Sequence, residues 1–438
     1  MALLQTAPSD AWTPSYATVA ARPGFAERLF VVGSMLLYAV ALPQDWFSVI
    51  DVKDSAGNAN ESTGALASVA FLGIGVIAFL VVLPRLHLVF QLARIAPALT
   101  TLGGYLLLST LWSSDPATTG RRALGVALTV FVAMYLVIRF DRDEILRYGA
   151  LASALSVWLN AAFVIGLPRY GVMADGRWDG LFLHKNQLGL NATFYLLLLL
   201  LQVAGAPRSR IWAVPSLVMA GILLIGSTSK TALSASVLLL GLLVVYQLFR
   251  ARRVLFGAVA VSLAAASVAA VLFVTANLPF FAEILDKDIT LSGRTKLWGL
   301  LLGEISKRPL LGYGYDGFWR GWFSPAHDVW IAADWRAPTA HNAALDYLLD
   351  LGVIGLALVL AYFLSALVRA TRDLRDTPGA IGTVPIAVLS YQLLFSITES
   401  GVITRSLPWL MICAMVFSVA LAQTGERQPV ADLEGSSP

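Results

Sequence analysis

Two short polar stretches of the sequence interrupt long apolar runs and carry groups that could activate a substrate. The stretch GLFLHKNQLGL contains His184, Lys185 and Asn186, and the stretch AHNAALDYLLDL contains His341 and Asn342. A neutral imidazole can accept a proton near physiological pH, so His341 is a candidate general base. Other interpretations stay open, since His341 could instead cap a helix. His184 and Lys185 could contact an anion or a sugar, or Lys185 could extend toward a membrane surface.

Arg294, in the stretch LSGRTKLW, is a candidate for binding an anion. Residues 295–305 place Leu, Trp and Ile side chains on one helical face, which predicts an amphipathic helix with Ser292 as its N-cap. A guanidinium group and the free N–H groups of a helix N-terminus can converge on one phosphate. Alternatively, Arg294 forms a salt bridge with Glu283 or Asp286 and only orients the segment.

The segment RPLLGYGYDGFW combines closely spaced glycines with aromatic residues. Gly312, Gly314 and Gly317 permit tight turns and a close approach of the backbone to a ligand. Tyr313 and Tyr315, which lie between these glycines, are therefore candidate substrate-binding residues.

Further charged residues lie at the ends of predicted membrane spans. Glu399, in ITESGVITR, is an ionisable group near the outer end of a span, which makes it a functional candidate. It could orient the imidazole or pair with an arginine. Arg121 and Arg122, in LWSSDPATTGRRAL, begin another span and are candidates for substrate binding. Asp346 and Asp350 follow one helical face, where they could hold a polar partner or sugar hydroxyl groups, or face solvent.

The sequence carries no pattern that indicates a metal or a cofactor. The four histidines are scattered without the spacing of a zinc site, and there is no glycine-rich nucleotide loop or serine-nucleophile motif. We therefore expect no metal and no cofactor. The net charge of +4 is explained by membrane orientation, so we expect no nucleic-acid partner.

The composition predicts an all-α, polytopic membrane protein. The chain is 58% hydrophobic and 13% charged, with a mean hydropathy of +0.73, whereas soluble domains are about 25% charged. Its apolar runs are long enough to cross a bilayer as helices, and no alternating barrel pattern is present. The twelve predicted spans are 27–44, 64–84, 94–112, 123–140, 145–168, 186–204, 211–226, 231–249, 254–276, 342–368, 382–403 and 406–424.

The placement of Lys and Arg in short loops predicts that both termini are cytoplasmic. The polar N-terminus has no apolar signal-peptide region, so we expect the first span to direct insertion. The predicted organisation is a cytoplasmic tail at 1–26, nine spans within 27–276, a large outer loop capping the site at 277–341, three spans within 342–424, and a cytoplasmic tail at 425–438. Outer cations that this orientation does not require are Arg121, Arg122, Arg169, Arg177, Lys185, Lys230, Arg294 and Arg405.

In their order and spacing, these stretches resemble the superfamily of O-antigen ligases and O-antigen polymerases, and most closely its exopolysaccharide polymerase branch. The resemblance is carried by GLFLHKNQLG, by SGRTKLW with RPLLGYGYDGFW, by HNAALDYLLDLGVIGL and by TES, together with twelve spans and a large outer loop. Members of that superfamily are bacterial membrane enzymes that act on glycans linked to undecaprenyl pyrophosphate.

The resemblance implies an inner-membrane glycosyltransferase that polymerises undecaprenyl-pyrophosphate-linked repeat units at the periplasmic face, by a metal-independent, inverting reaction. Arg294 would bind the pyrophosphate with help from Arg121 or Arg122. His341 would deprotonate or orient the acceptor hydroxyl, and Glu399 would support His341. The other residues expected to line the site are His184, Lys185, Asn186, Asn342, Tyr313 and Tyr315. The implied partners are the lipid-linked glycan, the bilayer, and the flippase and chain-length regulator of the same pathway.

Two alternatives stay open. The first is a ligase that transfers a finished glycan to lipid A core or another acceptor. The second is a twelve-helix transporter, which is disfavoured because the sequence shows no related halves and no matching pair of broken helices.

Overall fold

The structure is a computed structural model that describes residues 23–40, 64–182, 184–251, 294–400 and 402–424. The regular secondary structure of these residues is helical, with one isolated β-bridge between Val172 and Trp178 and no strand, which confirms the predicted all-α class for them. The α-helices are α1 (Phe25–Val40), α2 (Gly64–Val82), α3 (Leu86–Ile95), α4 (Pro97–Leu108), α5 (Pro116–Arg139), α6 (Arg142–Gly166), α7 (Pro168–Gly171), α8 (Lys185–Gly205), α9 (Arg210–Gly226), α10 (Lys230–Ala251), α13 (Arg294–Lys307), α14 (His327–Ala333), α15 (Ala343–Asp376), α16 (Val384–Thr398) and α17 (Leu407–Gln423).

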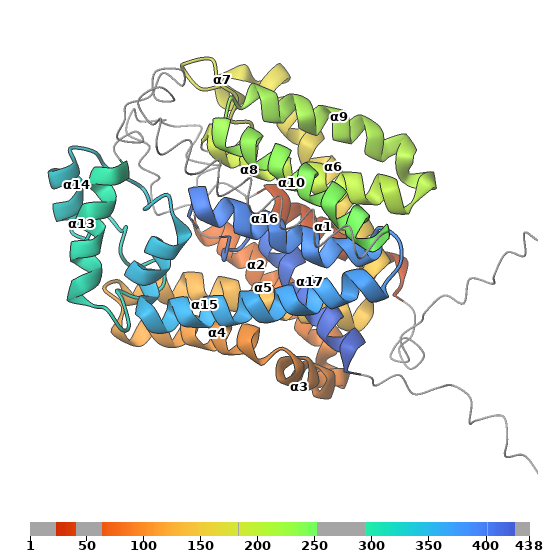
Figure 1. Cartoon of the computed structure of the whole chain (residues 1–438), viewed down its shortest axis with the longest axis horizontal. Helices are drawn as coiled ribbons and strands as arrows, with labels where there is room; N and C mark the ends of the chain where they lie inside the picture. The colour runs from red at the N-terminus through yellow and green to blue at the C-terminus, as the bar shows by residue number, and fades with distance from the viewer. Residues whose placement is uncertain (1–22, 41–63, 183, 252–293, 401, 425–438) are drawn as a thin grey trace, which may run out of the picture.

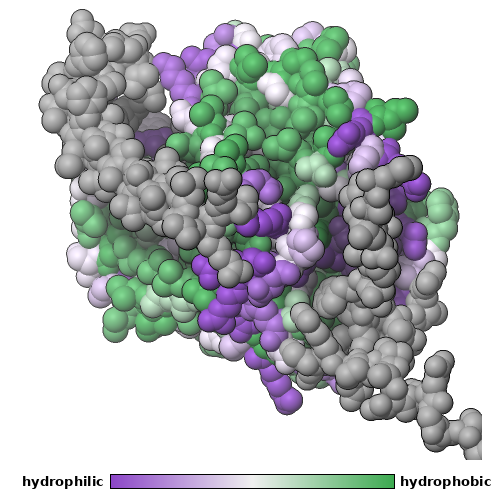
Figure 2. All heavy atoms as spheres, turned by 45° about the vertical axis from the view of Figure 1, so that its right-hand side comes forward, coloured by the Kyte–Doolittle hydropathy of each residue, from purple (hydrophilic) through white to green (hydrophobic). Residues whose placement is uncertain are grey.

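Seven helical stretches of the described residues are long and apolar enough to cross a membrane, and α16 and α17 are apolar but shorter. Their exposed side chains are largely apolar, as Leu80, Val218, Val237 and Leu360 illustrate. Figure 2 shows broad apolar areas on the described surface. Such a surface is suited to hydrocarbon. The predicted span at 254–276 lies outside the described residues, so the total of twelve stays a prediction.

The third predicted span, 94–112, is not a single helix. The helix α3 ends at Ile95, Ala96 has a non-helical backbone with φ −122° and ψ 58°, and α4 begins at Pro97. Proline lacks the N–H group that a continuing helix needs, and it disfavours helical backbone at the preceding residue. The chain therefore breaks at Ala96, and Ser68–Ile95 forms one apolar stretch before the break.

The helix α17 lies at the centre of the bundle. It packs against α5, α15, α16 and α1. Its side chains are buried on all faces, including Trp409 and Cys413, the single cysteine of the chain. Burial on every side explains why its sequence has no polar stripe.

The helix α15 is interrupted at Gly352, where φ is 65° and ψ is −169°. At the interruption, backbone N–H and C=O groups of α15 lose their partners within the helix, and they bond instead to the loop between α13 and α14. The N–H of Val353 donates to the carbonyl of Pro309, and the N–H of Tyr313 donates to the carbonyl of Leu349, both at 2.8 Å. Unpaired backbone groups are costly at membrane depth, so these bonds fix the loop to the broken helix.

The predicted span at 342–368 therefore differs from α15 in continuity and in length. The helix continues to Asp376, and its last turns carry polar residues. Asp373 accepts a hydrogen bond from Arg142 at 2.6 Å, and Arg139 at the end of α5 pairs with Glu27 of α1 at 2.7 Å. Buried arginines at this end of the bundle are thus matched with carboxylates.

A small helical cap, formed by α13 and α14, lies at the opposite end beside the start of α15 (Figure 1). Leu297 and Leu301 of α13 are fully buried in the core of this cap. The amphipathic helix predicted at 295–305 is therefore confirmed, although Leu302, expected on the buried face, is 57% exposed. The predicted N-cap, Ser292, lies outside the described residues.

We predict that Gly352→Ala destabilises the protein strongly. A Cβ atom at Gly352 would lie 2.2 Å from the carbonyl oxygen of Leu310. The backbone there, with φ 65° and ψ −169°, is one that essentially only glycine adopts, and it costs another residue about 1–3 kcal/mol. The free energy of unfolding in detergent should fall by more than about 2 kcal/mol. Gly221→Ala in α9 is the matched control, because no atom lies within 4 Å of that Cβ position. Equal stability of the two variants would contradict the structural role of the interruption.

Candidate functional site

Four polar side chains form a hydrogen-bonded row where α8 and α10 begin, α16 ends and α15 begins. The hydroxyl of Ser229 donates to Oδ1 of Asn186 at 3.1 Å. Nδ2 of Asn186 donates to Oε1 of Glu399 at 3.2 Å. Oε2 of Glu399 lies 3.2 Å from Nδ1 of His341. The carboxylate of Glu399 thus joins His341 to Asn186, two residues predicted from separate stretches of the sequence.

The contact with Glu399 determines how His341 can act. An ionised carboxylate only accepts hydrogen bonds, so the proton of a neutral His341 must lie on Nδ1. Nε2 then carries the lone pair and can accept a proton from a hydroxyl group. Both side chains are partly buried, at 16% and 12% exposed, so they remain within reach of a substrate.

The backbone of His341 is held in an uncommon conformation. Its φ is 52°, in the left-handed region that few residues with a Cβ adopt. Asn342 accepts a hydrogen bond from Leu345 N–H at 3.2 Å and caps α15 directly after this turn. The ring of Trp335 stacks on the imidazole, with centroids 5.9 Å apart and planes 7° apart. Backbone strain of this kind is typical of functional sites, where surrounding contacts keep it in place.

His184, predicted from the sequence to contact an anion or a sugar, caps α8. Its Nδ1 accepts a hydrogen bond from the N–H of Asn186 at 3.2 Å. Burial lowers the pKa of His184, and the charge of Lys185 lowers it further, while Glu399 acts in the opposite direction. His184 is therefore neutral near pH 7. The structure brings His184 close enough to Glu399 and His341 for their charges to act on it, and Lys185 lies between His184 and Asn186 in the chain.

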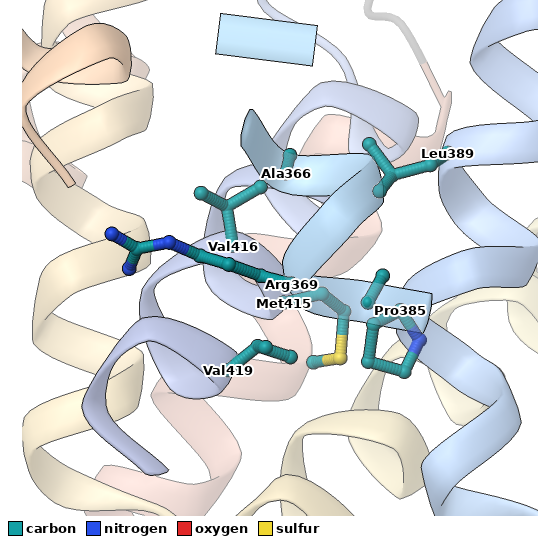
Figure 3. Close-up of a pocket in the computed structure, with 8 residues that line it drawn as sticks. Ala366, Arg369, Pro385, Leu389, Met415, Val416 and Val419 are labelled. Carbon is teal, nitrogen blue, oxygen red and sulfur yellow. The ribbon is translucent and has the colours of Figure 1, made fainter. Parts of the chain in front are cut away.

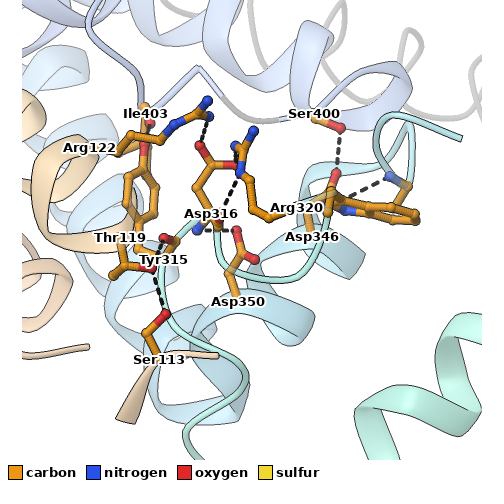
Figure 4. Close-up of polar contacts among 12 residues, drawn as sticks. Ser113, Thr119, Arg122, Tyr315, Asp316, Arg320, Asp346, Asp350, Ser400 and Ile403 are labelled. Atoms are coloured by element: carbon orange, nitrogen blue, oxygen red, sulfur yellow. Dashed lines mark hydrogen bonds and ion pairs between the residues drawn. The ribbon is translucent and has the colours of Figure 1, made fainter. Parts of the chain in front are cut away.

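Arg122 belongs to a second polar group, which connects α5 with the segment GYGYDGFW (Figure 4). Its guanidinium forms an ion pair with Asp316, and Arg320 forms another with the same carboxylate. Asp350 of α15 accepts a hydrogen bond from the N–H of Asp316 at 2.9 Å. Burial lowers the pKa of Arg320 to about 10, and the adjacent Arg122 contributes.

Two further arginines lie beside this group. The guanidinium of Arg405 lies 4.3 Å from the centre of the Phe71 ring. Burial lowers the pKa of Arg405, and the charges of Arg122 and Arg121 lower it further. Among the described residues, no carboxylate forms an ion pair with Arg405. Three cations, those of Arg121, Arg122 and Arg405, therefore gather at the same end of the bundle.

Tyr313 and Tyr315 are buried, and their hydroxyl groups bond to the protein. The hydroxyl of Tyr313 donates to Glu304 Oε2 at 3.1 Å, and that of Tyr315 donates to the carbonyl of Ile403 at 2.6 Å. These contacts hold the segment against the cap and the bundle. Direct contact of either tyrosine with a substrate stays a prediction.

Arg294 is the first residue of α13, as the sequence predicted. Trp298, one turn later on the same face, donates from Nε1 to the carbonyl of Ala340 at 2.9 Å. Ala340 directly precedes His341. Trp298 therefore holds the start of α13 against the segment that carries the imidazole. Contact of the Arg294 side chain with the site stays a prediction.

Several site residues were missed in the sequence. Their sequence neighbours are ordinary polar or aromatic residues, and only the contacts in the structure distinguish them. They are Ser229, Trp335, Asp316 and Arg320. The one available signal for Asp316 and Arg320 was their position in or beside the segment GYGYDGFW. Within the described part of the chain, no three His, Cys, Asp or Glu side chains are grouped so as to hold a metal.

A small crevice between α15, α16 and α17 lies far along α15 from His341 (Figure 3). Its lining is apolar except for Arg369, and it includes Leu389, Met415 and Val416. Such a surface offers little to a charged substrate, so we do not assign it to the site.

Comparison with known proteins agrees with the resemblance noted from the sequence. Residues 215–360 match the family model described as O-antigen ligase, a stretch that includes Arg294 and His341 but not Asn186 or Glu399. The chain is also 26% identical over 268 residues to the exopolysaccharide production protein ExoQ of Rhizobium meliloti (strain 1021). That match covers 58% of this chain and 60% of the relative, less than two thirds of its length. The resemblance to this superfamily, in its exopolysaccharide branch, is confirmed.

We predict that His184→Asn makes the protein less sensitive to acid. A lowered pKa means that the unfolded chain takes up the proton more readily, so wild-type stability falls as pH drops below the ordinary histidine value of 6.5. Asparagine keeps the helix cap without titrating. Thermal unfolding at pH 7 and pH 5 should therefore show a smaller loss for the variant. An equal loss would contradict the assignment.

Proposed function

We propose that the chain is a membrane glycosyltransferase that polymerises lipid-linked oligosaccharide repeat units at the outer face of the inner membrane. The observation that carries this proposal is the contact of Glu399 with both His341 and Asn186. These residues lie at the end of the bundle that also carries Arg121, Arg122 and Arg405, cations that membrane orientation does not require. The similarity to an exopolysaccharide production protein supports the substrate class.

The proposed reaction is a single displacement. The Nδ1–H group of His341 donates to Glu399, so Nε2 accepts the proton of the acceptor sugar hydroxyl. The acceptor oxygen forms a bond to the anomeric carbon as the bond from that carbon to the diphosphate oxygen breaks. The diphosphate leaves with the electron pair, and attack from the opposite side inverts the anomeric centre. General-base assistance contributes about 10²–10⁴-fold to such a step.

Fixed cations stabilise the charge that develops on the leaving diphosphate. Arg294 lies at the N-terminus of α13, where guanidinium and helix N–H groups can bind one phosphate. Arg121 and Arg405 lie at the same end of the bundle, and Arg122 is held by Asp316 beside them. Preorganised donors of this kind supply charge stabilisation without reorganisation during the reaction.

The proposed orientation places both termini in the cytoplasm and the predicted outer loop, residues 277–341, in the periplasm. The lipid chain of an undecaprenyl-pyrophosphate-linked unit would lie among the apolar helix surfaces, and its sugars would lie under the cap. The flippase and chain-length regulator of the pathway are the proposed partners.

The second candidate function is that of a ligase, which transfers a finished glycan to another acceptor. It is favoured by the match of residues 215–360 to a family model described as O-antigen ligase. The chemistry of His341 would be the same, and only the acceptor would differ.

We predict that His341→Ala and Arg294→Ala each abolish polymer formation, and that Glu399→Gln lowers it by about 10²-fold or more. Polymer length on gels is measured beside membrane abundance. His87→Ala and Arg372→Ala are matched controls, because both side chains are exposed and distant in the chain from the site. Wild-type chain lengths in the His341 and Arg294 variants would refute the proposed site.

We also predict that deleting the gene leaves single lipid-linked repeat units, because no unit can be joined to the next. Extracted lipid-linked glycans are sized by mass spectrometry. Long lipid-linked chains that fail to reach their acceptor would instead identify the ligase function.

A further inference from the structure

The carboxylate of Asp346 lies between the two chain segments that carry His341 and Glu399. Its Oδ1 accepts hydrogen bonds from the N–H of Ala340 at 3.0 Å and from Nε1 of Trp319 at 2.9 Å. Its Oδ2 accepts a hydrogen bond from the hydroxyl of Ser400 (Figure 4). Ala340 directly precedes His341, and Ser400 directly follows Glu399.

Asp346 is well suited to fix these segments. It lies in the first turn of α15 and is 7% exposed, so its own position is set by helix and packing. Each of its donors comes from a segment outside α15. If the carboxylate were removed, its buried donors would lose their acceptor, which is unfavourable for a buried polar group.

We propose that Asp346 is a positioning residue for the transfer reaction, acting through His341 and Glu399. This inference rests on the proposed function. The imidazole–carboxylate contact is 3.2 Å long, and it joins a strained turn to the end of a separate helix. One contact does not set the relative position of the two segments, so a group that bonds to both of them is needed. The carboxylate of Asp346 bonds to both. A displacement of about 1 Å in such an arrangement can lower a rate by about 10²-fold.

Asp350, one turn further along α15, has a different task. It accepts from the N–H of Asp316 at 2.9 Å and so supports the segment GYGYDGFW rather than the imidazole. Asp346 also contacts this segment, through Nε1 of Trp319. Only Asp346, however, bonds to the residues that adjoin His341 and Glu399, namely Ala340 and Ser400.

The test compares Asp346→Ala with Asp346→Asn in the full-length chain in nanodiscs. The substrate is the lipid-linked repeat unit extracted from a strain that lacks this gene. The asparagine oxygen can accept from both N–H donors, and its amide can donate to the hydroxyl oxygen of Ser400. Asp346→Asn should therefore keep kcat/KM per folded molecule within about tenfold of wild type, whereas Asp346→Ala should lose about 100-fold. Asp346→Ala should also move the midpoint of the pH–rate profile toward that of Glu399→Gln.

Asp373→Ala is the structural control. Asp373 is a buried carboxylate on the same helix, paired with Arg142 at 2.6 Å and remote from the site. This variant should lower the folded fraction without moving the pH midpoint or changing kcat/KM per folded molecule.

Three results would overturn the inference: activity of Asp346→Ala within tenfold of wild type, equal losses in Asp346→Ala and Asp346→Asn, or an unmoved pH midpoint in Asp346→Ala. His341→Ala and Glu399→Gln are assayed in parallel. If these two variants remain active, the proposed function fails. If they lose activity while Asp346→Ala does not, only the positioning role fails.

Discussion

A helix that is broken inside an apolar environment must find partners for the backbone groups it releases, and this requirement ties the cap to the bundle. At Gly352 the released groups of α15 are bound by the loop that follows α13. In lipid no water can replace these partners, so the loop and the helix are stable only together. The segment GYGYDGFW, which begins at this junction, is thereby placed beside α5 and Arg122.

The two ends of the bundle use their arginines differently. At one end, Arg139 and Arg142 are each matched with a buried carboxylate, which neutralises the charge and connects helices. At the other end, Arg122 and Arg320 share the one carboxylate of Asp316, and Arg405 packs on an aromatic ring close to Arg121 and Arg122. An arginine with its own carboxylate contributes to architecture, whereas guanidinium groups held close together are retained at a cost. That contrast is what favours an anionic substrate at the end that also carries His341.

Much of the site could be predicted from residue types alone. His341, Glu399 and Asn186 were singled out because polar groups are rare at the ends of apolar runs, and the structure brings these three together. Their connection could not be predicted, because Asn186 and Glu399 are 213 residues apart in the chain. Only the packing of α8 against α16 makes them neighbours.

The break in α15 and the ion-pair partner of Arg122 could not be predicted from the sequence, for different physical reasons. Glycine is common in membrane helices, so Gly352 looked no different from glycines that lie in regular helix. Arg122 and Asp316 are 194 residues apart, and their pairing depends on how the cap docks. The split of the predicted span 94–112, by contrast, had a visible cause in Pro97.

The pairing of Asp316 with two guanidinium groups has a consequence for any ligand that would use them. Asp316 is attached to the protein, and a tethered group competes at an effective concentration that reaches the millimolar range. In the proposed reaction, the diphosphate would displace the carboxylate of Asp316 before it binds Arg122 or Arg320. That exchange would lower the affinity for any anion, and more so for sulfate or free phosphate, which offer fewer contacts than a lipid-anchored diphosphate.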